Sequence, residues 1–184
     1  MLRDLGLLLL RVVTGGLLAG HGSQKLFGWF GGHGLAGTAG WLESLGIRPG
    51  RRWAPLAGGG EFAGGLLTAF GLFHPLGPIT MMGPMAVAIR RVHWGRPIWV
   101  TEGGAELPVT NLTIATTLML SGPGRLSLDH LLGIRLPAWM AGVAAGATAV
   151  GIVLAVTQGA PPEAEQAASG RLAGLEAAGT QAGG

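Results

Sequence analysis

The chain has 184 residues, of which 11% are charged and 48% are hydrophobic, and its mean hydropathy is +0.48. Soluble proteins average about 25% charged residues, so this composition indicates a membrane protein with several spans. The absence of cysteine excludes disulfides, thiolate catalysis, cysteine-ligated iron–sulfur clusters and covalent haem attachment within this chain. The formal net charge of +3 comes from arginines placed between apolar runs, which the positive-inside rule explains without a nucleic-acid partner.

Five apolar segments predict membrane-spanning helices. In chain order they cover about Leu5–Phe27, Trp53–Phe73, Leu76–Val92, Glu106–Ser121 and Leu136–Val156. A bilayer core of about 30 Å needs roughly 20 residues of helix. The second and fifth segments meet this length alone, whereas the third and fourth need tilt, flanking residues or burial in a bundle. The first is interpreted as an uncleaved helix, because no clean cleavage site follows it.

Two long segments lie outside these helices. The loop 28–52 is rich in glycine but contains aromatic and aliphatic residues such as Trp41, which predicts a short amphipathic helix at the membrane interface. The tail 158–184 is rich in Ala, Gly, Glu and Gln and is predicted to be disordered. The expected organisation is a four-helix membrane bundle over 1–135, an additional transmembrane helix over 136–157, and the tail.

Lys and Arg residues are unevenly distributed between the two sides that five spans would create. One side carries Lys25, Arg48, Arg51, Arg52, Arg90, Arg91, Arg96 and Arg171. The other carries Arg3, Arg125 and Arg135, with Arg11 just inside the first segment. The bias predicts a cytoplasmic location for the first and third loops and for the C-terminal tail, and an N-terminus outside.

The end of the first segment carries three polar side chains on one helix face. His21, Gln24 and Lys25 are spaced by three and four residues, which places them side by side. Their convergence favours a polar cluster that binds a head group, a quinone carbonyl or an anion, with His21 as a proton-active group. The structural alternative is that Lys25 reaches to the interface while His21 bonds a carbonyl.

Glu61 interrupts the second apolar segment. It lies between Gly58-Gly59-Gly60 and Gly64-Gly65, and small residues at such spacing favour close helix contact. A carboxylate at membrane depth is costly, so we expect it to face another helix and to pair with Lys25, His21 or Arg11. Two hypotheses fit this position equally well. Glu61 either handles a proton or anchors a ligand, or it is one member of a purely structural ion pair.

Further polar residues could line the same interior. Arg90 and His93 share a face at the end of the third segment, although flanking cytoplasmic charge also explains them. Glu106 begins the fourth segment, where a carboxylate at a helix start is the simpler interpretation. No metal site is predicted, because the chain has no HExxH motif and no His pair four residues apart. A haem held by His21 and His93 is a weak alternative.

The fifth segment has no ionisable residue but carries a small-residue stripe. Gly142 and Gly146, followed by Gly151, present a smooth face to which another helix could pack. We therefore interpret this segment as a docking helix and not as part of the polar site.

Three sequence blocks, LLLRVVTGGLLAGHGSQKLFGWFGG, GGGEFAGGLLTAFGLF and GPGRLSLDHLLG, follow one another along the chain. Together, over about Leu5 to Gly133, they resemble the DoxX family of small bacterial membrane proteins. The resemblance implies a four-helix membrane bundle, to which the fifth segment and the tail are additions. It also implies a relation to the small subunit of a thiosulfate:quinone oxidoreductase and to membrane oxidoreductase complexes that handle oxidative stress. The residues that match the motifs by position are His21, Gln24, Lys25, Glu61, Arg125 and Asp129.

The leading hypothesis is a small integral membrane subunit of a quinone-linked oxidoreductase in the bacterial plasma membrane. Its buried polar pocket would take a quinone or a small oxyanion, and no intrinsic cofactor is predicted. The alternative is a non-enzymatic accessory or assembly subunit that docks on a larger membrane complex through the fifth segment. Both hypotheses imply contact with the lipid bilayer and with other membrane-protein subunits. A solute transporter is less favoured, because five spans show no inverted repeat.

Overall fold

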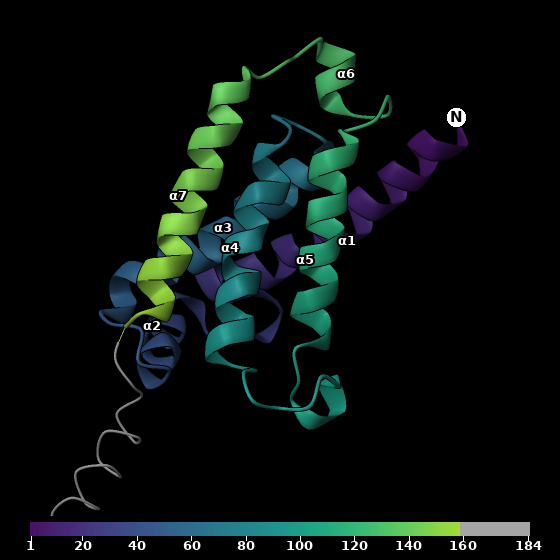
Figure 1. Ribbon diagram of the computed structural model, residues 1–184. Helices are drawn as coiled ribbons and strands as arrows, with labels where there is room; N and C mark the ends of the chain where they lie inside the picture. Colours follow the sequence, from purple (N-terminus) through teal and green to yellow (C-terminus); the bar gives the residue numbers. More distant parts are fainter. Residues whose placement is uncertain (159–184) are drawn as a thin grey trace, which may run out of the picture.

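The computed structural model describes residues 1–158, and this part of the chain is helical without strands. Its helices are α1 (Leu2–Phe27), α2 (Gly34–Ser44), α3 (Gly50–Phe70), α4 (Leu76–Arg91), α5 (Glu106–Ser121), α6 (Leu128–Leu132) and α7 (Ala138–Val156), shown in Figure 1. Two short 3₁₀ turns, η1 (Trp29–Gly31) and η2 (Val100–Glu102), lie in the loops. The predicted all-helical class is confirmed, and the five apolar segments coincide with α1, α3, α4, α5 and α7.

Glycines allow α1 and α3 to pack against each other in antiparallel fashion. A Cβ atom added at Gly15 would lie 2.5 Å from the carbonyl oxygen of Gly65, and one added at Gly22 would overlap the backbone nitrogen of Phe62. Such contacts exclude any larger side chain and bring the two backbones together. This close packing sets the position of the C-terminal part of α1 against the middle of α3.

The helix α4 lies at the centre of the remaining helices and contacts α3, α5 and α7. It runs antiparallel to α3 and parallel to α7, because a Cβ at Gly83 would contact the Thr148 side chain while Arg91 donates to the carbonyl oxygen of Ala155. By contrast, α3 and α7 make few direct contacts with each other. They therefore flank α4 as two separate walls.

The loop helix α2 packs on the start of α3. Ala39, Leu42 and Ile47 form a small buried cluster with Ala54. The Thr38 hydroxyl also donates to the carbonyl oxygen of Lys25, at 3.1 Å, which ties α2 to the end of α1. The predicted short helix in loop 28–52 is thus present.

Within residues 1–158, the two helices α1 and α7 are long and apolar enough to cross a membrane by length and composition. In Figure 1 the N-terminus and α6 lie at one end of the molecule, and α2 lies at the other. The tail predicted to be disordered over 158–184 lies outside the described residues except for Gln158, whose carbonyl oxygen accepts a hydrogen bond from Arg91 at 2.7 Å.

Candidate functional site: an apolar cavity with a Lys–Glu pair

Lys25 and Glu61 form an ion pair between α1 and α3. The Lys25 ammonium donates to Oε1 of Glu61. The carboxylate side chain is 3% exposed and the Lys25 side chain 25% exposed. The second carboxylate oxygen, Oε2, is buried and has no hydrogen-bond partner among the described residues. The lysine is therefore the polar group of the pair that stays accessible.

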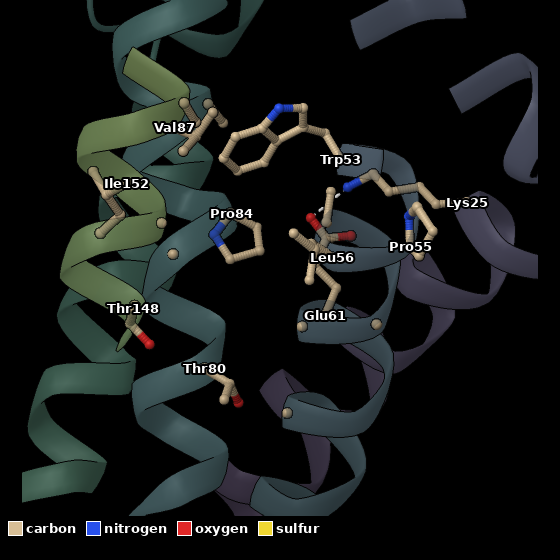
Figure 2. Close-up of a pocket in the computed structure, with 18 of the residues that line it drawn as sticks. Lys25, Trp53, Pro55, Leu56, Glu61, Thr80, Pro84, Val87, Thr148 and Ile152 are labelled. Carbon is tan, nitrogen blue, oxygen red and sulfur yellow. Dashed lines mark hydrogen bonds and ion pairs between the residues drawn. The ribbon is translucent and has the colours of Figure 1, made fainter. Parts of the chain in front are cut away.

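The pair lies at the wall of a cavity of about 540 Å³. The cavity occupies the space between α3 and α7, with α4 behind it, as Figure 2 shows. Its volume falls in the range of sites that bind small organic molecules, about 300–1,000 Å³. Trp41, Leu42, Leu45 and Ile47 of the α2 segment also line the cavity, and α3 and α7 make few direct contacts with each other across it.

Apolar side chains make up most of this wall. In Figure 2 the space is surrounded by Trp53 and Leu56 of α3, Pro84 and Val87 of α4, and Ile152 of α7. The polar residues among the lining set are Lys25, Glu61, Thr80 and Thr148. The Thr80 hydroxyl donates to backbone carbonyls of its own helix, so Lys25 and Glu61 supply the charge. Such a site suits a flat apolar molecule that carries one polar group.

The other polar residues predicted near Lys25 do not line the cavity. His21 is exposed, and its Nδ1 donates to Oε1 of Gln24 at 3.1 Å. Gln24 in turn donates to the carbonyl oxygen of Phe30 at 3.3 Å. The two side chains therefore form a local pair that closes the turn after α1.

Arg90, His93 and Glu106 also lie away from the cavity. The Arg90 guanidinium is 5.2 Å from the ring centre of Trp94, and the His93 ring donates to the carbonyl oxygen of Gly103 at 2.7 Å. Glu106 accepts from the backbone nitrogen of Val100 at 2.9 Å, next to the start of α5. These contacts organise the α4–α5 loop and are not joined to the Lys25–Glu61 pair.

Arg11, a sequence-level candidate to pair with Glu61, has other partners. It is 2% exposed and donates to the carbonyl oxygens of Leu126, at 2.5 Å, and Ala69, at 3.4 Å. Its guanidinium therefore joins α1 to the end of α3 and to the segment before α6. Of the three partners predicted for Glu61, which were Lys25, His21 and Arg11, the structure therefore pairs it with Lys25.

A second buried carboxylate, Asp129, organises the turn between α3 and α4. It accepts from the backbone nitrogens of Phe73 and His74, at 2.8 and 2.7 Å. Ser127 caps α6 by accepting from the nitrogen of His130, so this helix begins at Leu128. Burial lowers the pKa of His74 below its usual value of 6.5, although its hydrogen bond to the Met119 carbonyl opposes the shift.

The three glycines of the predicted docking helix have different surroundings. Gly142 and Gly146 are exposed, and a Cβ at either would meet no atom within 4 Å. Gly151 lines the cavity instead, together with Ile152. The sequence interpretation therefore missed that α7 forms part of the site.

Trp53 and Pro84 are among the lining residues that sequence analysis did not select. A signal for Trp53 was present, because Trp53, Gly60, Gly64 and Leu67 recur at the spacing of one helix face that includes the glycines around Glu61. No comparable pattern marks Pro84 or α7, whose contribution depends on how distant segments pack. Within residues 1–158, no group of three or more His, Asp or Glu side chains is placed to hold a metal ion.

Comparison with known proteins gives one positive result. A family model described as DoxX matches residues 6–94, the part of the chain from α1 to the turn after α4. Neither a curated protein nor a solved structure matches the chain. The match includes both residues of the ion pair, whereas α5, α6 and α7 lie outside it. Through residues 6–94, the chain belongs to DoxX, a family of membrane-integral proteins.

Proposed function

We propose that the protein is a small integral membrane subunit of a quinone-linked oxidoreductase complex. In this proposal the cavity between α3 and α7 binds the ring of a quinone. The single observation that carries it is an apolar cavity of about 540 Å³ with the partly exposed Lys25 side chain at its wall. A quinone ring is flat and apolar, and its carbonyl oxygens accept hydrogen bonds. Membership of the DoxX family, often associated with oxidoreductase-related functions, supports the same proposal.

The membrane arrangement that accompanies this proposal has five spans. Four of them, α1, α3, α4 and α5, would form the bundle, and α7 would add a fifth span beside α4. The short helices α4 and α5 are packed against their neighbours, which allows them to cross with help from flanking residues. The cavity would then open between α3 and α7 toward the bilayer, where quinones dissolve.

Quinone binding by the purified protein tests the proposal. We expect a short-chain quinone to bind the wild-type protein in detergent or nanodiscs and to quench the fluorescence of Trp53 at the cavity wall. Lys25→Ala removes the hydrogen-bond donor and should weaken binding by about tenfold, the effect of about 1.4 kcal/mol. Binding that is unchanged in Lys25→Ala and in Glu61→Gln, with normal helical content, would contradict the proposal.

The exposed outer face of α7 favours a second candidate, a non-enzymatic accessory subunit. Trp139, Val143 and Val150 are more than half exposed there, beside Gly142 and Gly146. A helix of a partner membrane protein could pack on this face.

Two matched substitutions in α7 distinguish the candidates. Gly151→Leu would place a side chain in the cavity and should reduce quinone binding, whereas Gly146→Leu would alter only the outer face. If Gly146→Leu releases the protein from a larger complex purified from native membranes, and Gly151→Leu has no effect on quinone binding, the accessory function is favoured.

A further inference from the structure

The charge balance of the cavity wall determines which head groups the site accepts, and this argument rests on the proposed function. Lys25 and Glu61 are the charged residues among those that line the cavity. Since they form an ion pair with each other, the wall has no net charge. An anion entering the cavity would lose its hydration and gain no unbalanced positive charge in return.

The two members of the pair are not equally accessible. Glu61 is 3% exposed, and its Oε2 is buried without a hydrogen-bond partner among the described residues. Lys25 is 25% exposed, and an ammonium has three donors, of which Glu61 uses one. A bound molecule would therefore meet a hydrogen-bond donor whose charge is already neutralised.

We infer that the cavity selects uncharged, carbonyl-bearing rings over anionic ones of the same size, and that Glu61 sets this specificity. Glu61 acts by balancing the charge of Lys25. Small oxyanions, and rings that carry an ionised oxygen, are excluded by the same balance. Removal of the carboxylate charge converts the wall into a site for anions.

Two naphthoquinones of nearly equal size provide the test. Menadione is uncharged, whereas lawsone is an anion at neutral pH because its enolic hydroxyl is acidic. We expect the wild-type protein in nanodiscs of uncharged lipid to prefer menadione, after correction for partition into protein-free nanodiscs. In Glu61→Gln the unbalanced Lys25 should shift the ratio of the two affinities toward lawsone by about tenfold or more. Partition into lipid cancels when this ratio is compared between variants.

The double variant Lys25→Gln/Glu61→Gln is the matched control, because it leaves no unpaired charge. Its preference should return to menadione. A wild-type preference for lawsone, or an unchanged ratio in folded Glu61→Gln, would overturn the inference while leaving the quinone site in place. If Glu61→Gln does not fold, the wild-type preference decides whether the cavity favours the uncharged ring. Lys25→Gln then tests the charge balance, because its unpaired Glu61 should shift the ratio further toward menadione, and an unchanged ratio would overturn the inference. Failure of both rings to bind the wild-type protein would instead overturn the proposed function, and the inference with it.

Discussion

At the scale of single residues, the Lys25–Glu61 pair combines burial with unequal exposure. The carboxylate is enclosed by α1 and α3, and one of its oxygens lacks a hydrogen-bond partner among the described residues. A lone carboxylate in that position would be strongly unfavourable. The buried Glu61 carboxylate therefore needs Lys25 as its partner in the folded state, whatever the pair does for a ligand.

Lys25→Met should lower the free energy of unfolding by about 3 kcal/mol, because it leaves the Glu61 carboxylate buried and unpaired. The double variant Lys25→Met/Glu61→Leu should recover most of the loss, since an apolar pair of similar size has no charge to bury. Thermal unfolding in detergent, followed by circular dichroism, measures both. Equal losses in the single and double variants would show that the ion pair is not the source of the effect.

His74 predicts a dependence of stability on pH. Burial holds its pKa in the folded protein below the usual 6.5, so the unfolded chain binds the proton more tightly. The contribution of His74 to the free energy of unfolding is therefore complete above pH 6.5 and is lost as the pH falls through the lowered pKa.

Unfolding measured between pH 8 and pH 5 should show this decrease in the wild-type protein and a shallower one in His74→Gln. An identical pH profile in the two proteins would exclude His74 as the titrating group.

At the scale of helices, the α1–α3 contact depends on some glycines of α1 and not on others. Gly22 of α1 faces the backbone of α3 at Phe62, whereas Gly16 has nothing within 4 Å of an added Cβ. The same substitution at these two positions therefore has opposite expected effects.

Gly22→Ala should destabilise the protein by about 1–3 kcal/mol, because the new methyl group forces the two helices apart. Gly16→Ala should be neutral or stabilising by up to about 1 kcal/mol, since alanine favours helix more than glycine does. Thermal unfolding of the two variants beside the wild-type protein measures the contrast. A Gly22→Ala variant as stable as Gly16→Ala would mean that the helices are not in close contact there.

Sequence periodicity predicted the helices well and the cavity only in part. Apolar runs bounded by polar residues placed the ends of α5 at Glu106 and Ser121, as observed. A lone charge in an apolar run also identified Lys25 and Glu61, because burial of a charge requires a partner. The contribution of α7 was not predictable in this way, since Gly151 reaches the site only through the packing of α7 on α4.

At the scale of the whole molecule, the helix directions place the basic residues predominantly at one end. Since α1 and α3 are antiparallel and α4 and α7 are parallel, the C-terminal ends of α1, α4 and α7 lie at the same end of the molecule. The backbone nitrogen of Arg48 accordingly donates to the side chain of Gln158, at 2.5 Å. By the positive-inside rule this end is expected in the cytoplasm.

Because the chain has no cysteine, single introduced cysteines can report its orientation. Thr101→Cys lies in the exposed loop at the basic end, and His130→Cys lies in α6 at the opposite end. We expect a membrane-impermeant maleimide to label His130→Cys in intact cells and Thr101→Cys only after the membrane is permeabilised. The reverse pattern would place the N-terminus inside.

The cavity lies between α3, which belongs to the part of the chain that matches DoxX, and α7, which lies outside that part, and the two helices make few direct contacts. A molecule bound there would touch both walls, so part of its binding free energy would also hold α7 in place. At a ligand concentration one hundred times the Kd, this linkage amounts to about 2.7 kcal/mol. The packing of α7 on the rest of the protein would then be most stable when the cavity is occupied. A protein in contact with α7 would therefore sense whether a ligand is bound.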